Sequence, residues 1–114
     1  MNGCIFCRIA ARQAPARILF EDDEMIAFHD VAPRAPVHVL VIPRRHIVSL
    51  AAASGDDQAL LGRLLLGAAE AARRCAVAES GYRVVTNCGA RAGQSVLHVH
   101  LHVLGGRTLS GPPG

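Results

Sequence analysis

Three histidines, His98, His100 and His102, alternate with aliphatic residues near the end of this 114-residue chain. Such alternation is typical of a β-strand, in which successive side chains point to opposite faces at a rise of about 3.3 Å per residue. The pattern predicts that the imidazoles share one open face and that the aliphatic residues face the core. Imidazoles about 6.6 Å apart are too widely spaced to ligate one ion unaided, but they can act together on a phosphate group.

A loop rich in hydrogen-bond donors, residues 93–96, precedes these histidines. Attack of a histidine on phosphorus requires a neutral imidazole, donors for the non-bridging oxygens and an acid for the leaving group. The histidines, the Ser95 hydroxyl and the loop's backbone N–H groups can supply all three. A catalytic metal on the three histidines is an alternative, but this strand carries no carboxylate to complete such a site.

The composition excludes several kinds of chemistry. All 12 basic residues are arginine, so a Schiff-base lysine and a Walker-type phosphate-binding lysine are excluded. The net charge is +3, but the arginines are scattered, and no nucleic-acid partner is expected. No apolar run approaches the roughly 18 residues that a membrane span needs. The N-terminus lacks a signal-peptide pattern, which favours a cytoplasmic protein.

The pattern of apolar residues predicts an α+β fold with a five-stranded antiparallel sheet, one long helix and one short helix. The predicted strands are residues 17–21, 24–29, 37–43, 82–87 and the histidine-bearing segment. Ser54 is a natural N-cap, with Asp57 in capping-box position, for a long amphipathic helix that Gly81 would end. A short helix is expected over residues 7–11. We interpret residues 1–114 as one domain, in which the tail 105–114 is either held by the rest or mobile.

Four further features have more than one interpretation. Cys4 and Cys7 are consistent with half of a zinc site, a redox pair or two buried thiols. His46 is a surface residue by default and a candidate third zinc ligand. His38, inside an aliphatic run, is either a core residue or part of the site. Asp30 either caps a turn or binds a ligand's hydroxyl groups.

The motif His98-Val-His-Leu-His-Val-Leu104 resembles the signature of the histidine triad family. Four further segments, residues 28–30, 35–38, 41–43 and 105–107, look like parts of its Hint branch, so the resemblance covers nearly the whole chain. It implies the HIT-like fold and a homodimer that joins two sheets into one of ten strands. It also implies hydrolysis of purine nucleoside phosphoramidates or acyl-nucleotides, with no metal needed for catalysis.

The resemblance also implies roles for particular residues. His100 would attack the α-phosphate to give a nucleotidyl-imidazole, His102 would contact the phosphate, Ser95 would donate to the phosphate or leaving group, and His38 would orient the histidines. Asp30 would hold the ribose, and Ile5, Phe6, Ile9 and Phe28 would sandwich the purine. The implied nucleotide-binding set is Ile5, Phe6, Ile9, Phe28, His29, Asp30, Val31, Asn87, Gly93, Gln94, Ser95, Val96, His100 and His102.

Relatives with Cys-x-x-Cys at this position bind zinc, and the implied ligands here are Cys4, Cys7, His46 and His98. Two thiolates and two imidazoles form a closed, structural site. One departure concerns the tail, where Gly111 replaces a tryptophan of the animal members and leaves the preference for the leaving group open. Two alternatives remain, a dinucleoside polyphosphate hydrolase and a nucleotide-binding interaction module. Gly105-Gly106 in place of the proline of the polyphosphate branch counts against the first.

Overall fold

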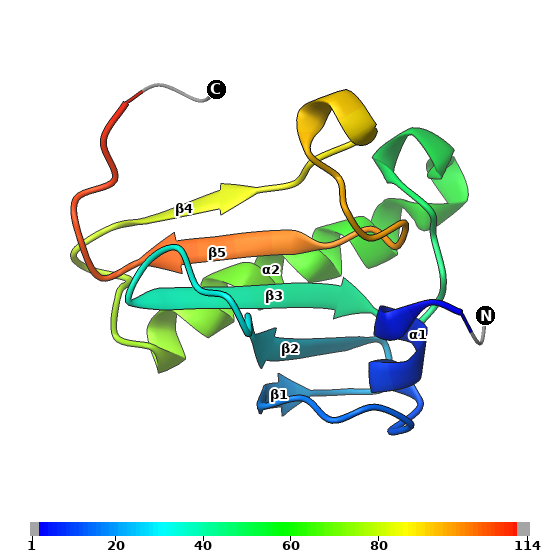
Figure 1. Cartoon of the computed structure of the whole chain (residues 1–114), viewed down its shortest axis with the longest axis horizontal. Coiled ribbons are helices and arrows are strands. Elements are labelled where there is room, and N and C mark those ends of the chain that lie inside the picture. Colours follow the sequence, from blue (N-terminus) through cyan, green and yellow to red (C-terminus); the bar gives the residue numbers. More distant parts are fainter. Residues whose placement is uncertain (1–2, 112–114) are drawn as a thin grey trace.

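The computed structural model describes residues 3–111 and contains one five-stranded antiparallel sheet (Figure 1). The strand order is β1-β2-β3-β5-β4. The strands are β1 (Ile18–Glu21), β2 (Met25–His29), β3 (Val37–Pro43), β4 (Tyr82–Val85) and β5 (Leu101–Gly105). The helices are α1 (Ile5–Ala10) and α2 (Gln58–Arg74), with single 3-10 turns at Leu50–Ala52, Gly55–Asp57 and Ala90–Ala92. The predicted fold class is confirmed.

The two faces of the sheet are covered differently. The long helix α2 lies across one face (Figure 1) and buries an aliphatic cluster that includes Val39, Val41, Leu64 and Val103. The short helix α1 covers only the β2 and β3 part of the other face, where Phe6 and Ile9 pack on residues of those strands. The β5 and β4 part of that second face is therefore not covered by a helix.

Strand register places His102 on this second face. Phe28 of β2 pairs with Leu40 of β3, Leu40 pairs with His102 of β5, and His102 pairs with Val85 of β4. Directly paired residues point to the same side of a sheet. Phe28 and Leu40 belong to the cluster under α1, so His102 and Val85 continue the same face into its uncovered part.

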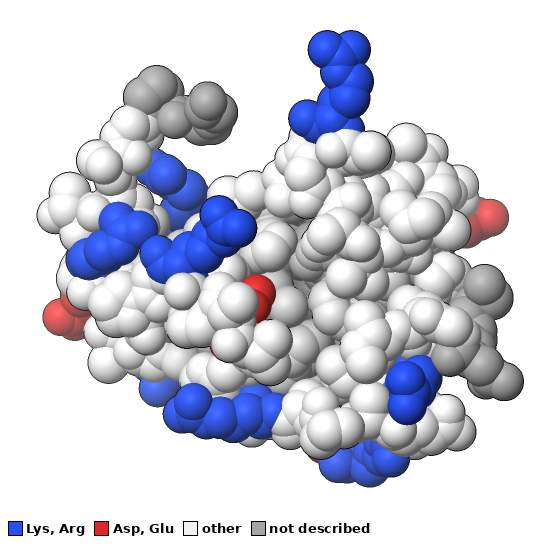
Figure 2. Space-filling view, in the orientation of Figure 1, with Lys and Arg blue, Asp and Glu red and all other residues white. Residues whose placement is uncertain are grey.

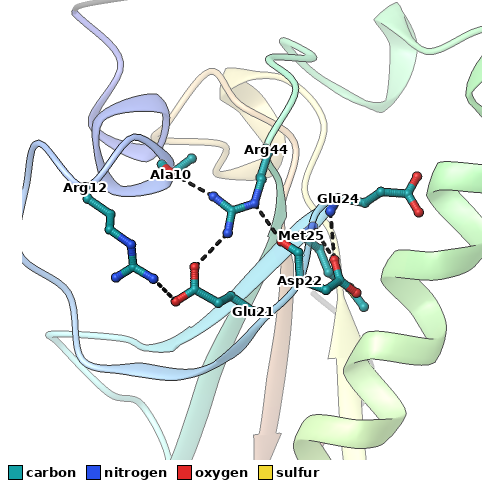
Figure 3. A network of polar contacts seen from close by, with 7 residues as sticks. All are labelled: Ala10, Arg12, Glu21, Asp22, Glu24, Met25 and Arg44. Atoms are coloured by element: carbon teal, nitrogen blue, oxygen red, sulfur yellow. Dashed lines mark hydrogen bonds and ion pairs between the residues drawn. The ribbon is translucent and has the colours of Figure 1, made fainter.

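Arg44, at the end of β3, attaches α1 to the hairpin of β1 and β2 (Figure 3). Its guanidinium donates to Ala10 O at 2.9 Å, to Asp22 O at 2.7 Å and to Glu21 Oε1 at 2.6 Å. The hydrogen bond from Arg44 lowers the pKa of Glu21. Asp22 forms the predicted tight turn, because its Oδ1 accepts the N–H groups of Glu24 and Met25. This network fixes α1, and with it the two cysteines, beside the end of β3.

Two helix boundaries differ from the prediction. The short helix begins earlier than residue 7, because Cys4 acts as its N-cap and accepts the Cys7 N–H on Sγ at 3.4 Å. The long helix does not end at Gly81. It ends at Arg74, because Ala76 adopts a left-handed φ of 60° and Val77 N donates to Ala72 O at 3.0 Å, the two marks of a Schellman motif. The predicted capping box of Ser54 and Asp57 is present.

The histidine-bearing strand is shorter than the alternation predicts. β5 starts at Leu101, so His98 and His100 precede it, and both are buried, with exposed fractions of 0% and 4%. The prediction of three histidines on one open face is therefore wrong. Residues 98–100 are not part of the strand. Instead, the Val99 N–H donates to Ile47 O at 2.7 Å, in the loop that follows β3.

The C-terminal segment is held against the sheet as far as it is described. Arg83 donates to the carbonyl oxygens of Leu109 and Gly111 at 3.4 and 3.3 Å, and Arg107 donates to Arg34 O at 2.9 Å. The tail is thus attached to β4 and to the loop before β3. Within residues 3–111, no helix has the length and apolar character needed to cross a lipid bilayer.

Candidate functional site

His100 is held by a hydrogen bond to the backbone two residues earlier. Its Nδ1 lies 2.7 Å from His98 O. Because a carbonyl oxygen can only accept, Nδ1 carries the proton and Nε2 of the neutral ring has a free lone pair. Phe6 packs edge-on against the ring at a centroid distance of 5.0 Å. The hydrogen bond and the aromatic contact therefore orient the ring of His100 and leave Nε2 without a backbone partner.

A second chain of hydrogen bonds orients His102. The Arg34 backbone N–H donates to Nδ1 of His38 at 3.0 Å, so neutral His38 carries its proton on Nε2. That Nε2 lies 2.9 Å from Nδ1 of His102 and donates to it. His102 must then carry its own proton on Nε2, where it is available as a donor to an anionic oxygen.

Burial favours the neutral forms of His102 and His38. Burial, with the charges of His100 and His38, lowers the pKa of His102 to about 4. Burial also lowers the pKa of His38, and the charge of Arg34 adds to this effect while Asp30 opposes it. The carboxylate of Asp30 lies 3.4 Å from Nε2 of His38, and its Oδ1 accepts the Ala32 N–H at 2.8 Å. At neutral pH both rings therefore have the tautomers deduced above.

A cavity of about 440 Å³ opens over this uncovered part of the sheet. The floor contains residues of the strands, and the rims are the loop before β3 and the loop before β5. The lining residues are Asp30, Ala32, Arg34, His38, Val85, Asn87, Gly93, Ser95, His102 and Leu104. Ser95 and Asn87 thus lie around the same space as His102.

The loop before β5 is fixed by Gln94. Its buried side chain accepts the Gly89 N–H at 2.8 Å and donates to the carbonyl oxygens of Val48 at 2.7 Å and Val96 at 3.1 Å. The amide is fully used in these bonds, so its role is to shape the loop that presents Ser95. The backbone N–H of Gln94 is also used, since it donates to Gly89 O at 3.1 Å. Gly93 adopts a left-handed φ of 92°, which favours glycine at this turn.

The residues expected around a purine are only partly together. Phe6, Ile9 and Phe28 form one buried group under α1, with the rings of Phe6 and Phe28 5.6 Å apart. Ile5 is 41% exposed and lines a separate, largely apolar cavity with Val48, Leu97 and also Ser95. Val31 is 99% exposed, and His29 lies half-buried at the end of β2. Val96 packs beside the buried group.

Cys4, Cys7, His46 and His98 form a second cluster between α1, the end of β3 and the segment before β5. Nδ1 of His98 lies 3.4 Å from the Cys4 sulfur, 3.5 Å from the Cys7 sulfur and 3.2 Å from Nδ1 of His46. The Cys7 sulfur lies 3.1 Å from Nδ1 of His46. In a tetrahedral zinc site neighbouring ligand atoms are about 3.3–3.8 Å apart, given bonds of about 2.0–2.3 Å. The four side chains fit such a site.

The protonation of His98 agrees with ligation. Its Nε2 lies 2.9 Å from Pro43 O, so Nε2 carries the proton and Nδ1 presents a lone pair to the cluster. Burial, together with Cys4, raises the pKa of the Cys7 thiol. A cation among these ligands would stabilise the thiolate form. The donor set and its orientation therefore favour a divalent metal such as zinc.

Sequence reasoning missed Ala32, Arg34, Val85 and Leu104, which line the cavity. Strand alternation carried a signal for two of them, since Leu104 is two residues from His102 and Val85 lies opposite it. Arg34 had no such signal. Its position follows from the loop before β3, which places its backbone against His38 and its side chain at the cavity rim.

Comparisons with known proteins agree with this geometry. An uncharacterized HIT-like protein of Synechocystis is 52% identical over 110 residues, which is 96% of each chain. The crystal structure of a HIT family hydrolase from Legionella pneumophila has a TM-score of 0.96 at 44% identity, covering 98% of this chain and 100% of that one. A Zn-bound histidine triad family protein from Mycobacterium smegmatis has a TM-score of 0.79 at 33% identity, covering 93% and 76%. Because the HIT domain model matches residues 11–109, the chain belongs to the HIT (histidine triad) family.

Proposed function

We propose that this protein is a purine nucleotide-binding hydrolase of the Hint branch. Its proposed reaction cleaves nucleoside 5′-phosphoramidates or acyl-nucleotides and releases the nucleoside monophosphate. The observation that carries the proposal is a pair of oriented imidazoles whose ring centroids lie 5.0 Å apart, His100 with a free Nε2 and His102, which lines the cavity, with a donor Nε2–H. One ring attacks phosphorus while the other stabilises the oxygens that gain charge.

In the proposed first step, Nε2 of His100 forms a bond to the α-phosphorus and the P–N bond to the amine breaks. The departing amine takes up a proton, for which we propose the Ser95 hydroxyl on the cavity wall as the donor. In the second step water adds to phosphorus, the Nε2–P bond breaks, and the water's proton restores the donor. The net reaction consumes one water and yields an amine and a monophosphate.

The binding roles follow the shape of the site. We assign the ribose hydroxyls to Asp30 and the phosphate oxygens to His102, Asn87 and Ser95, with the backbone N–H of Ser95 as a further donor, because the N–H groups of Gly93 and Gln94 donate to Ala90 O and Gly89 O. We assign the purine to the side of the site formed by Phe6, Ile9 and Phe28, with Ile5, His29 and Val31 as further contacts. His38 acts as a positioning residue through His102.

We also propose that Cys4, Cys7, His46 and His98 bind a structural zinc ion. The fit of the ligand distances and the Zn-bound relative support this assignment. The ion would hold α1 against the segment that contains His98, and the proposed chemistry uses no metal. A cytoplasmic location is part of the proposal, because a reducing compartment keeps both thiols available as ligands.

A homodimer is the proposed assembly. β4 is an edge strand, and apolar side chains at this side of the molecule are exposed, including Tyr82 at 38%, Val84 at 38% and Leu65 at 58%. Antiparallel pairing of two β4 strands would satisfy both edges and give a ten-stranded sheet. Light scattering after size exclusion should give twice the chain mass, and Val84→Lys should give a monomer while Leu50→Lys, an exposed residue of a 3-10 turn, should not.

The test of the reaction is release of AMP from adenosine 5′-phosphoramidate. His100→Ala should lower kcat by at least about 1,000-fold, because the covalent route is lost. Calorimetry should still detect AMP binding to the variant, which separates loss of chemistry from loss of fold. Arg73→Gln, at the exposed end of α2, is a control that should keep wild-type turnover. Retained turnover in His100→Ala would rule out the mechanism, and cleavage of dinucleoside polyphosphates alone would rule out the substrate class.

A further inference from the structure

The floor of the cavity lined by His38 and His102 extends toward the β4 edge of the sheet. Leu104 is on the same face of β5 as His102, and Val85 of β4 pairs with His102. The buried aromatic group under α1 lies on the opposite side of His102, across β3 and β2. A nucleotide with its base on the α1 side therefore directs its leaving group over Leu104 and Val85.

Arg34 lies at the rim of this second half of the cavity. Its backbone is fixed at both ends of the residue, because its N–H donates to His38 at 3.0 Å and its carbonyl oxygen accepts from Arg107 at 2.9 Å. The exposed side chain is thus attached to a rigid part of the site. Arg34 thus lines the same cavity as His102.

The charge of Arg34 is not neutralised by a carboxylate among residues 3–111. Other arginines of the described chain form ion pairs, such as Arg44 with Glu21 and Arg45 with Asp57, whereas no ion pair joins Arg34 to Asp30, the acidic residue of the same cavity. Asp30 already accepts the Ala32 N–H and lies against His38.

Arginines gather at this end of the molecule. Arg107 and Arg83 hold the C-terminal segment beside the loop of Arg34. Figure 2 shows blue side chains grouped at the left of the view, over the end of the sheet where this segment leaves β5, with red side chains beside them. Among the residues that line the cavity, Arg34 is the cation, Asp30 is the anion, and Val85 and Leu104 are apolar.

We propose that Arg34 selects substrates whose leaving group carries a negative charge, so that the preferred substrates are nucleoside phosphoramidates of amines that bear a carboxylate. This inference rests on the proposed function and names its substrate class. The carboxylate of an amino acid attached through nitrogen to phosphorus is only a few bonds from the scissile P–N bond. It can thus reach the guanidinium while the phosphate stays at His102, and an arginine pairs well with a carboxylate because both are planar and fork-shaped.

The experiment compares two substrates that differ only in charge, the adenosine 5′-phosphoramidates of β-alanine and of β-alanine amide. The measured quantity is the ratio of kcat/KM for the acid to that for the amide, which does not depend on the fraction of active protein. The wild-type ratio should be about ten, the effect of one partly exposed charge-assisted hydrogen bond. It should fall to near one in Arg34→Gln, stay above about three in Arg34→Lys, and be unchanged in Arg73→Gln.

Salt supplies an independent readout. Raising the ionic strength from about 0.05 to about 0.5 M shortens the Debye length to below about 5 Å and should lower the wild-type ratio but not that of Arg34→Gln. A wild-type ratio near one, or the same ratio in Arg34→Gln, would overturn the inference and leave the hydrolase intact. If neither compound is cleaved, the proposed function fails. In that case the dissociation constants of the same two compounds test the role of Arg34, and equal constants would overturn the inference.

Discussion

The backbone oxygen of His98 accepts the Nδ1 proton of His100 at 2.7 Å, while the side chain of His98 lies within 3.5 Å of two cysteine sulfurs. His98 thus links the cluster of cysteines and histidines to His100, the proposed nucleophile. Phe6 contacts both rings, with centroid distances of 5.8 and 5.0 Å. We therefore expect a change in the geometry of this cluster to shift His100, through the His98 carbonyl group and the Phe6 ring.

Loss of one sulfur ligand tests this link. Cys7→Ser should lower bound zinc from one per chain to nearly none and lower Tm by more than about 10 °C, because the metal holds segments that are far apart in sequence. Turnover should fall about tenfold as His98 shifts. Cys88→Ser is the matched control, since Cys88 is exposed and outside the cluster. Full activity in zinc-free Cys7→Ser would show that the cluster and the nucleophile are independent.

The hydrogen-bond chain through His38 predicts different effects for two amide substitutions. In His38→Gln the amide nitrogen can still donate to Nδ1 of His102, whereas in His38→Asn the amide oxygen can only replace the acceptor for the Arg34 N–H. We expect kcat to fall about tenfold in His38→Gln and about 100-fold in His38→Asn. Equal losses, measured with adenosine 5′-phosphoramidate on samples of matched thermal stability, would contradict a role in setting the tautomer of His102.

The pKa of His102 predicts how stability depends on pH. Its value of about 4 in the folded protein lies below the usual 6.5 of an unfolded chain, so only the unfolded state takes up this proton as the pH falls from 6.5 to 4. The free energy of unfolding should therefore decrease over that range, by about 2 kcal/mol at pH 5 from this residue.

Urea unfolding of wild type and His102→Gln at pH 7 and pH 5 measures this contribution. Glutamine does not titrate, so the variant should lose less stability between the two pH values. Metal ligands and other histidines are common to both proteins and cancel in the comparison. Parallel pH dependences would show that His102 is protonated in the folded protein at pH 5.

The end of α2 offers a stability test away from the site. Ala76 is in the left-handed region, with φ 60°, where a Cβ atom costs about 1 kcal/mol. Ala76→Gly should therefore raise the free energy of unfolding by about 0.5–1 kcal/mol. Ala69→Gly, in the interior of α2, should lower it by about 1 kcal/mol. If both variants are less stable than wild type, the helix does not end in this Schellman motif.

Local patterns in the sequence were sufficient for the strands, the long helix and the residue types of the site. Alternation identified β5 and β4, and the capping box of Ser54 and Asp57 located the start of the helical region. These signals are local, because side-chain periodicity and capping depend on neighbours in the chain. The resemblance to the histidine triad family then indicated which histidine, serine and aspartate to examine together.

Only the tertiary structure decided which groups share a space. Alternation placed His98 beside His100 and His102, but contacts with Cys4, Cys7 and His46, far away in sequence, turn it into a different cluster. The tautomers of His38 and His102 depend on a backbone N–H of Arg34. The charged rim of the cavity depends on a loop whose path no periodicity encodes. Each of these features comes from packing between distant segments, which the order of residues alone does not specify.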